Sequence, residues 1–419
     1  MSDVPCSLAP LDPYALAALH DQSPVFDRYR VLDPVHWGRP LQGGQSGCWY
    51  LTRYDDVVSV IRSGQVGHDR PPRGSRRELV LKGDAFSIDD VLDQWFVFMD
   101  GGEHQRLRSV LGQPLKALVN DSTRRRLEGL AHGLIDAFPA SRSFDLLSCY
   151  NYPFPVIAVA ELIGFPPGDR DRLLRWAQTF IQVFDLRNDD VVRRVQEAFI
   201  EFFEYLRGRL AERRAPFGGD LLGVLARAER DRAITHNELL CTAALLLLAG
   251  AETTPTLIGN AIWLLLSHRD AREAFLVDER LTESTIDEVM RFESPVQLTG
   301  RHALVDFRLR GKHITKGEYV VALYGAANRD PKQFADPARF DIRRTPNRHL
   351  GFGVGVHACV GGGLGHLIGQ VAVRSLLERL PGLGLETPGA DWRGHGSIRG
   401  LRSLRVRQAG FGHTARFDV

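Results

Sequence analysis

A cysteine lies in a glycine-rich stretch of the chain, from His349 to Gly363, that reads HLGFGVGVHACVGGG. Cys359 stands directly before a helical pattern, so backbone N–H groups of the loop and the positive end of that helix both favour a thiolate. A thiolate held in this way can be an axial ligand to haem iron. The alternative is that Cys359 is an inert core thiol, as buried cysteines commonly are.

The same loop superficially matches a dinucleotide-binding fingerprint, because residues Gly353 to Ala358 fit the pattern G-x-G-x-x-A. That motif must follow a buried strand, whereas the segment from Arg343 to Leu350 is polar and contains Pro346. The fingerprint also requires an acid at the end of a later strand, but Glu378 falls within a helical pattern. We therefore reject a dinucleotide site.

The most apolar window of the chain, from Leu239 to Leu266, has a recognisable helix start. Thr235 and Glu238 form a capping box ahead of it, and the helical pattern continues to about Arg269. Glu252 and other polar residues in its middle would be costly within a bilayer. We therefore expect a long helix through the protein core and no membrane span.

Pro255 should interrupt this long helix. It has no N–H for the carbonyl of Ala251, and its ring crowds that carbonyl, so the helix should open or kink near Gly250. Glu252 and Thr253 stand beside the expected opening. The opening is either a functional groove or a kink that only fits the packing of the helix.

Composition limits the class of protein. The chain has 419 residues, 44% hydrophobic and 25% charged, so it can bury a large core, and no linker or repeat divides it. We expect one domain over residues 1–419. The net charge of +2 gives no global reason to expect nucleic acid as a partner. The cysteines are dispersed and no signal peptide precedes the chain, which predicts a soluble, cytoplasmic protein.

Hydrophobic periodicity predicts a mostly helical protein with small β-sheets. The expected helices, besides the long one, cover residues 55–62, 124–138, 169–184 and 191–214, and the expected strands cover 48–52, 307–309 and 319–323.

The segment from Phe352 to Gly361 spells F-G-x-G-x-H-x-C-x-G. This pattern resembles the haem-binding signature of the cytochromes P450, the haem-thiolate monooxygenases. Four other segments resemble motifs of that family, its bacterial members in particular, in the expected order. They are Asp100 to Arg108, Ala249 to Thr254, Glu288 to Arg291, and Ala327 to Asp341.

Each of these segments alone has a simpler explanation. Glu288 and Arg291 could be a surface pair, and His104 and Arg108 could be a solvated helix face. Their joint order around one cysteine favours the resemblance, because no packing requirement would produce it.

The resemblance implies the cytochrome P450 fold, with haem b between a long distal helix and the helix after the cysteine loop. It implies Cys359 as the axial ligand of the iron, with Phe352 and Gly353 in the binding loop and Ala249 in the distal groove. The implied partners of the haem propionates are His104, Arg108, Arg301 and His357.

The resemblance also implies the activity. Thr253 and Glu252 would deliver the protons that O2 activation needs, which argues for O2 as oxidant. Electrons would come from NAD(P)H through a separate ferredoxin reductase and ferredoxin, since the chain carries no flavin module or cysteine cluster. A buried ion network would join Glu288, Arg291 and Arg339.

Exposed arginines are candidate contacts for an acidic redox partner, although such residues usually serve only solvation. They are Arg106, Arg124, Arg125 and Arg126.

The substrate is expected to be a lipophilic small molecule of secondary metabolism, such as a polyketide, terpenoid or aromatic alkaloid. The expected pocket residues are Trp95, Phe96, Phe98, Phe180, Phe184, Leu246, Val296 and Leu298. An acidic group on the substrate could meet Arg73, Arg76 and Arg77, or these could form a solvated loop. Two rival functions remain: a peroxide-driven or oxidative-coupling enzyme, and a haem-thiolate protein that binds a ligand without turnover.

Overall fold

The computed structural model describes residues 8–17, 19–41, 46–68, 78–81, 84–184, 188–212, 218–393 and 397–408. The helices within these ranges are α1 Pro13–Ala17, α2 Ser23–Leu32, α3 Tyr54–Arg62, α4 Ile88–Asp93, α5 Gly101–Ala117, α6 Asp121–Asp136, α7 Pro153–Ile163, α8 Arg170–Phe180, α9 Asp189–Glu212, α10 Leu221–Arg230, α11 His236–Ala249, α12 Thr253–Ser267, α13 Arg269–Val277, α14 Leu281–Phe292, α15 Tyr324–Ala327 and α16 Gly362–Arg379. The strands are β1 Val35–Gly38, β2 Cys48–Leu51, β3 Val66–Gly67, β4 Glu78–Leu81, β5 Asp84–Ser87, β6 Ser143–Asp145, β7 Leu298–Ala303, β8 Phe307–Leu309, β9 Lys312–Ile314, β10 Tyr319–Leu323, β11 Leu383–Leu385, β12 Asp391–Trp392, β13 Leu401–Ser403 and β14 Arg405–Gln408.

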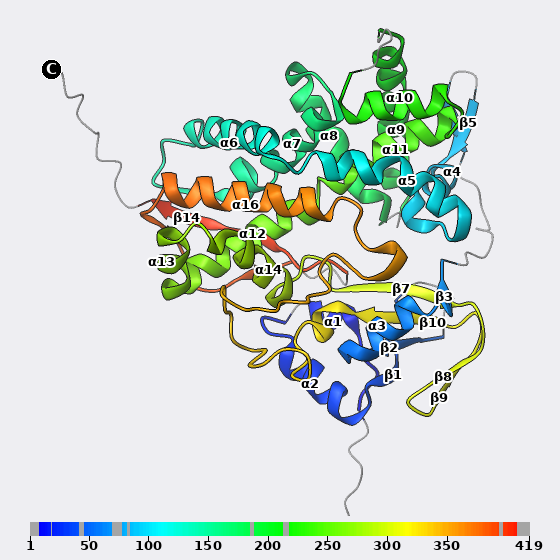
Figure 1. The fold of residues 1–419 in the computed structure, drawn as a ribbon, viewed down its shortest axis with the longest axis vertical. Helices are drawn as coiled ribbons and strands as arrows, with labels where there is room; N and C mark the ends of the chain where they lie inside the picture. The colour runs from blue at the N-terminus through cyan, green and yellow to red at the C-terminus, as the bar shows by residue number, and fades with distance from the viewer. Residues whose placement is uncertain are drawn as a thin grey trace, which may run out of the picture.

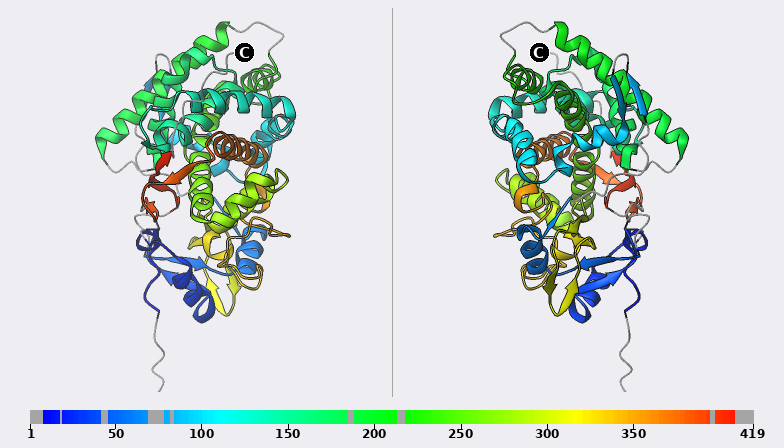
Figure 2. Two further views of the ribbon diagram at one scale, coloured as in Figure 1. Left: turned by 90° about the vertical axis from the view of Figure 1, so that its left-hand side faces the viewer. Right: turned by 90° about the vertical axis from the view of Figure 1, so that its right-hand side faces the viewer.

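The helices and the main sheet occupy different parts of the molecule. Figure 1 shows α16 crossing the helical part, with α6 on one side and α12 and α14 on the other. The side views in Figure 2 show the N-terminal strands and the β7–β10 region together at the opposite end from α8 and α9. The main sheet has the order β1-β2-β10-β7-β3, in which β10 runs parallel to β2 and the other neighbours are antiparallel.

Alternation along β10 gives this sheet two buried faces. Val320 and Ala322 join a cluster with residues of α3, whereas Val321 and Leu323 join a cluster with residues of α2. Successive side chains of a strand point to opposite faces, so this apolar strand can be covered on both sides. A separate and larger cluster fills the helical part.

The expected fold class is confirmed. The predicted strands are observed as β2, β8 and β10, and the predicted helices as α3, α6, α8 and α9. The segment predicted as one helix over 169–184 is two pieces, because α8 ends at Phe180 and a 3-10 turn covers Ile181–Phe184. Short strands such as β6, β11 and β14 were missed because their pairing joins segments far apart in the chain.

The long central helix begins and breaks as expected. Thr235 Oγ1 accepts the N–H of Glu238 at 3.2 Å, and Glu238 Oε2 accepts the N–H of Thr235 at 2.7 Å, which completes the capping box. α11 then ends at Ala249 and α12 begins at Thr253.

The span His236–Ser267 is long and apolar enough to cross a membrane by length and composition. However, 78% of its most apolar window is buried inside the protein, as expected of a core helix.

Candidate functional site

Backbone hydrogen bonds and two left-handed glycines hold the cysteine loop. The N–H of Cys359 donates to the carbonyl of Phe352 at 2.8 Å, which closes the loop before α16. Gly353 and Gly355 have φ of 71° and 78°, a conformation that residues with a Cβ rarely adopt. These glycines therefore set the path of the backbone that presents the thiol.

The thiol of Cys359 is accessible although protein atoms surround it. The residue is exposed, yet burial raises the pKa of the thiol, with a hydrogen bond from the backbone N–H of Gly361 acting in the opposite direction. The backbone of Gly361 thus acts in the direction that the sequence predicted, but burial outweighs it, and a metal ion would have to displace the proton, as metal binding to thiols generally does.

The break between α11 and α12 carries the expected distal residues. Ala249 is exposed although most of α11 is buried, and Thr253 Oγ1 donates to the carbonyl of Ala249 at 3.3 Å. α12 packs against α16, and a Cβ on Gly365 of α16 would lie 3.9 Å from both Phe352 Cε1 and Thr254 Oγ1. The break and the cysteine loop therefore lie on neighbouring elements.

Basic side chains from three elements converge beside the loop. Arg108 of α5 donates through Nη2 to the carbonyl of Ala358 at 2.6 Å. The ring of His104, also on α5, lies 4.2 Å from that of His357 between ring centroids. Arg301 of β7 is buried and donates through Nη1 to Thr299 Oγ1 at 2.8 Å.

The electrostatics of this cluster favour an anion. Burial, together with the neighbouring His357, Arg108 and Arg301 and against the opposing effect of Asp100, lowers the pKa of His104 to about 4. The Nε2 atom of His104 is buried and has no hydrogen-bond partner among the described residues. The guanidinium groups of Arg108 and Arg301 and the unpartnered Nε2 of His104 fit the two propionates of a haem. The negative charge of a buried propionate must be paired with such groups.

Asp100 is a member of this cluster that the sequence interpretation missed. Its Oδ1 lies 3.0 Å from Nε2 of His357, and its Oδ2 accepts the N–H of His68. Its position directly before Gly101 and α5 was the available signal, because an acid is favoured at a helix N-terminus.

The expected pocket residues divide into accessible and inaccessible groups. Phe184 is 53% exposed and Phe98 is half-buried, and their ring centroids lie 6.4 Å apart. Trp95 and Phe180 have no accessible surface. Trp95 Nε1 donates to the carbonyl of Cys241 at 2.9 Å, and Phe180 stacks on a neighbouring ring of α9. Both side chains are therefore packed inside the protein in this structure, and their place in a substrate pocket stays a prediction.

The other expected pocket residues lie at or below the surface of the core. Phe96 and Leu246 are buried in the large helical cluster, and Val296 is half-buried and pairs with Ile398 in an isolated β-bridge. Leu298 packs in the cluster on the α2 side of the sheet.

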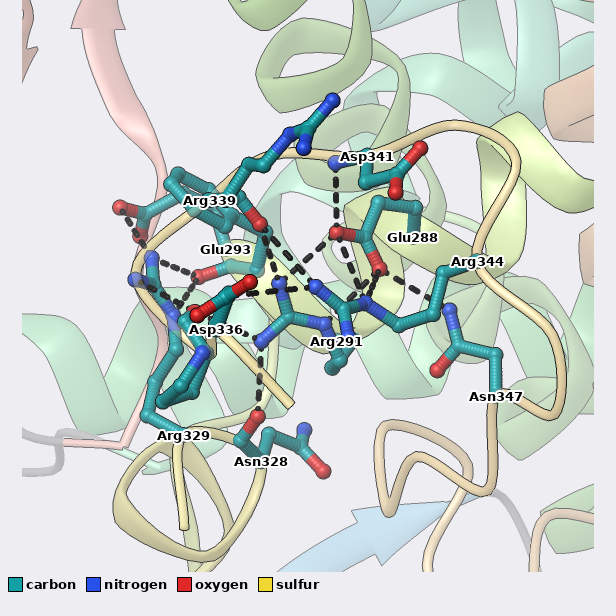
Figure 3. A network of polar contacts seen from close by, with 12 residues as sticks. Glu288, Arg291, Glu293, Asn328, Arg329, Asp336, Arg339, Asp341, Arg344 and Asn347 are labelled. Atoms are coloured by element: carbon teal, nitrogen blue, oxygen red, sulfur yellow. Dashed lines mark hydrogen bonds and ion pairs between the residues drawn. The ribbon is translucent and has the colours of Figure 1, made fainter. Parts of the chain in front are cut away.

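Glu288 and Arg291 form a fully buried ion pair (Figure 3). Arg291 Nε and Nη2 each donate to a carboxylate oxygen of Glu288 at 2.8 Å, and both side chains have 0% exposure. The remaining Nη1 donors reach the carbonyls of Asn328 and Pro337 at 3.0 and 2.9 Å. The pair therefore holds the segment between β10 and the cysteine loop against α14.

The third member of the network is not the expected one. Arg339 is exposed, and only its backbone carbonyl takes part, accepting from Arg291 Nη2 at 3.0 Å. The second guanidinium on Glu288 belongs to Arg344, whose Nε lies 3.1 Å from Oε2. Asn347 Nδ2 donates to the same oxygen at 3.0 Å. The prediction for the Arg339 side chain is therefore wrong, because an extended chain can present its carbonyl while its side chain faces solvent.

The arginines expected to contact a redox partner differ in whether their side chains already bind other residues of this chain. Arg106 donates to both oxygens of Glu238 and so ties α5 to the start of α11. Arg124 Nη2 donates to Gln370 Oε1 at 2.9 Å, and Arg126 lies 3.8 Å from Glu161. Arg125 is exposed. The expected substrate contacts Arg73, Arg76 and Arg77 lie outside the described residues.

Comparison with known proteins gives the family. The cytochrome P450 family model matches residues 172–381. The chain is 35% identical to the mycinamicin IV hydroxylase/epoxidase of Micromonospora griseorubida, covering 88% of this chain and 90% of that one. It is 33% identical to the cytochrome P450 monooxygenase PikC of Streptomyces venezuelae, covering 92% and 91%. The structure of P450BioI in complex with a hexadec-9Z-enoic acid ligated acyl carrier protein superposes with a TM-score of 0.81 at 28% identity, covering 93% of this chain and 99% of that one.

The chain belongs to the cytochrome P450 family. It is an oxygenase whose cofactor is haem and whose oxidant is O2, with electrons derived from NAD(P)H through redox partners.

Proposed function

We propose that this protein is a haem-thiolate monooxygenase that oxidises a lipophilic small molecule in secondary-metabolite biosynthesis. One observation carries the proposal: an accessible thiol in a tightly held loop lies beside basic side chains from three elements. The similarity to a hydroxylase/epoxidase and to a monooxygenase supports a hydroxylation or epoxidation. We place the protein in the cytoplasm, as one domain over residues 1–419.

Each side chain of the proximal site has a proposed role. Cys359 would bind the iron, and His104, Arg108, Arg301 and His357 would hold the propionates. The iron with its thiolate ligand supplies the chemistry of O–O bond cleavage. The N–H of Cys359 is already used by Phe352, which orients the backbone that carries the sulfur.

Thr253 and Glu252 are the proposed proton-delivery pair. The hydroxyl of Thr253 makes a long hydrogen bond of 3.3 Å to Ala249, so it can reorient towards another acceptor at little cost. Glu252 lies within the break and is half-buried. This pair would hold and move protons on the side of the site that O2 must reach, and it supports O2 rather than peroxide as the oxidant.

The absorption spectrum of the dithionite-reduced protein under carbon monoxide tests the ligand. We expect a strongly red-shifted Soret band in the wild type and its loss in Cys359→Ala. The matched control is Cys149→Ala, since Cys149 is half-buried and its thiol donates to the carbonyl of Asp145 at 3.3 Å, away from the cysteine loop. A red-shifted band that survives Cys359→Ala would overturn the assignment.

The proposed electron donor is a ferredoxin with its reductase. Arg125 supports this proposal, because it is exposed on α6, which packs against the helix that follows the cysteine loop. We expect Arg125→Glu to raise the ferredoxin concentration needed for half-maximal turnover, with the wild-type value rising as salt is added. Equal values for the variant and the wild type would contradict a docking role.

Isotope labelling separates this function from its rivals. A product that carries one oxygen atom from labelled O2 supports a monooxygenase. A product without label, or full activity with hydrogen peroxide alone, would favour an oxidative-coupling or peroxide-driven enzyme, and absence of any turnover would favour a ligand-binding protein.

A carrier-bound substrate is a second candidate, favoured by the similarity to the P450 solved with a ligated acyl carrier protein. Comparing the same acyl group free and attached to a carrier protein would decide between the two forms. Tighter spectral binding of the attached form would support delivery by a carrier, and equal binding would exclude it.

A further inference from the structure

A carboxylate outside the proposed haem site joins the segment before the cysteine loop to the helix after it. Asp287 of α14 accepts two hydrogen bonds on the same oxygen, Oδ1. Nε2 of His349 lies 3.2 Å from it, and Nε2 of His366 lies 3.0 Å from it. Both imidazoles are largely buried, with 8% and 13% exposure.

The direction of each hydrogen bond on His366 follows from Arg124, which bonds to Gln370 at the edge of this cluster. Arg124 can only donate, so Oε1 of Gln370, 2.9 Å from Arg124 Nη2, must be an acceptor. The amide Nε2 of Gln370 then donates to Nδ1 of His366 at 2.7 Å. His366 therefore carries its proton on Nε2 and donates it to Asp287.

The other imidazole is fixed in the same tautomer. The N–H of Gly351 donates to Nδ1 of His349 at 3.1 Å, so this nitrogen is an acceptor and Nε2 carries the proton. Asp287 is the group that both protonated nitrogens share. Burial alone would raise the pKa of Asp287, but the hydrogen bonds from the two histidines outweigh it and hold the pKa well below its usual range.

The backbone that His349 holds is the backbone that positions the cysteine. Gly351 is followed by Phe352, whose carbonyl accepts the N–H of Cys359 at 2.8 Å. The ring of Phe352 lies 5.9 Å from His349 and 6.3 Å from His366 between centroids, so both imidazoles flank it. A Cβ on Gly351 would lie 2.7 Å from the side chain of Met290, so this backbone lies close against α14.

We propose that Asp287 is a positioning residue for the cysteine ligand. By accepting from both imidazoles it fixes the tautomer of His349, which holds Gly351 and through Phe352 sets the hydrogen bond at the amide of Cys359. The inference rests on the proposed role of Cys359 as the iron ligand. Hydrogen bonding around a ligating sulfur tunes the reduction potential of the metal, so the consequence is measurable in the haem protein without turnover.

Three variants of α14 test the proposal in purified, haem-loaded protein. Asp287→Ala removes the accepting oxygen, whereas Asp287→Asn removes the charge and keeps one oxygen that can accept from both imidazoles. Glu283→Gln, one turn earlier on the exposed face of α14, is the matched control. The readouts are the ferric/ferrous midpoint potential and the position of the ferrous carbon monoxide Soret band.

We expect Asp287→Ala to shift both readouts, while Asp287→Asn and Glu283→Gln stay close to the wild type. Equal shifts in the Ala and Asn variants would overturn the proposal, because the effect would then be one of charge. Reduced thermal stability with an unchanged potential and band would also overturn it, since Asp287 would be only structural.

His349→Leu provides a second, independent test. This variant decides the proposal if Asp287→Ala yields no folded haem protein. It removes the acceptor for Gly351 directly and should shift the potential in the same direction. The double variant should shift it no further than either single variant, because both act through one hydrogen bond. An unchanged potential in His349→Leu contradicts the proposal, whereas failure of Cys359 as ligand would be seen separately in the Cys359→Ala spectrum.

Discussion

The guanidinium of Arg291 donates through Nη2 to the backbone carbonyl of Arg339 at 3.0 Å, while the side chain of Arg339 faces solvent. Each nitrogen of the Arg291 guanidinium thus donates to Glu288 or to a backbone carbonyl. A buried charge that is fully paired in this way tolerates the loss of neither partner.

Arg291→Ala should therefore leave Glu288 buried with its closest partner missing. Loss of one member of a buried ion pair costs about 3–5 kcal/mol. We expect little folded, haem-containing protein from this variant, measured as the yield of red-shifted absorbance per protein and as the denaturant midpoint.

Arg339→Ala is the matched comparison, because it removes an exposed guanidinium and keeps the carbonyl that Arg291 uses. A change within about 0.5 kcal/mol is expected, as for other exposed positions. A loss comparable to that in Arg291→Ala would show that the Arg339 side chain does belong to the network.

The contacts that local geometry alone predicted are those within a short stretch of chain. Glu288 and Arg291 are three residues apart on one helix, and the loop pattern around Cys359 is contiguous, so local geometry brings these groups together. The contacts that were missed, Asp100 with His357 and Arg344 with Glu288, join segments 257 and 56 residues apart. Such contacts depend on tertiary packing, which periodicity does not encode.

The sequence also did not show which of the expected aromatic pocket residues are buried. Aromatic residues expected in the pocket could face a ligand or fill the core, because both environments favour the same side chains. Only the packing of α9 behind Phe180 distinguishes the two.

Thr253→Ala should separate electron consumption from product formation. The change removes the proposed hydroxyl from the break but no ligand of the haem, so the spectrum should be unchanged while reducing equivalents are diverted to hydrogen peroxide. The measurement is product and peroxide formed per NAD(P)H oxidised. Thr254→Ala is the control, since Thr254 is buried one position further along, towards α16. Unchanged yield of product per electron in Thr253→Ala would exclude the assigned role.

The contact between Gly250 and Val159 should exclude any side chain larger than that of glycine at position 250, in the helix break. A Cβ on Gly250 would lie 2.8 Å from Cγ2 of Val159 on α7, which is too close for two carbon atoms. Gly250→Ala should therefore lower stability by about 1–3 kcal/mol, as overpacking in cores does.

The double variant Gly250→Ala with Val159→Ala tests the cause. Removing the two methyl groups relieves the closest contact and leaves Cβ of residue 159 at 3.0 Å, so the double variant should be more stable than the sum of the single effects predicts. Additive losses would show that the backbone of the break, and not this contact, requires glycine.

Two neighbouring tyrosines should respond differently to loss of the hydroxyl. Tyr150 donates to the carbonyl of Ala372 at 2.8 Å, whereas the buried hydroxyl of Tyr152 has no hydrogen-bond partner among the described residues. Tyr150→Phe should cost about 1 kcal/mol, the usual net value of such a hydrogen bond. Tyr152→Phe should be neutral or stabilising, because it removes an unsatisfied polar group. A loss in Tyr152→Phe equal to that in Tyr150→Phe would show that a bound water satisfies this hydroxyl.

Asp287 should make the stability of the protein depend on acidity. Its pKa is lower in the folded protein than in the unfolded chain, where it is about 3.9. A carboxyl of this kind contributes its full stabilisation above the unfolded pKa and loses it as the pH falls towards the folded pKa, because the unfolded chain then binds the additional proton. The Asp287→Asn side chain has no carboxyl group that can bind this proton. The unfolding temperature of the variant should therefore fall less steeply than that of the wild type from about pH 4.5 downward. Parallel profiles of the two proteins over that range would show that the histidines do not stabilise the carboxylate.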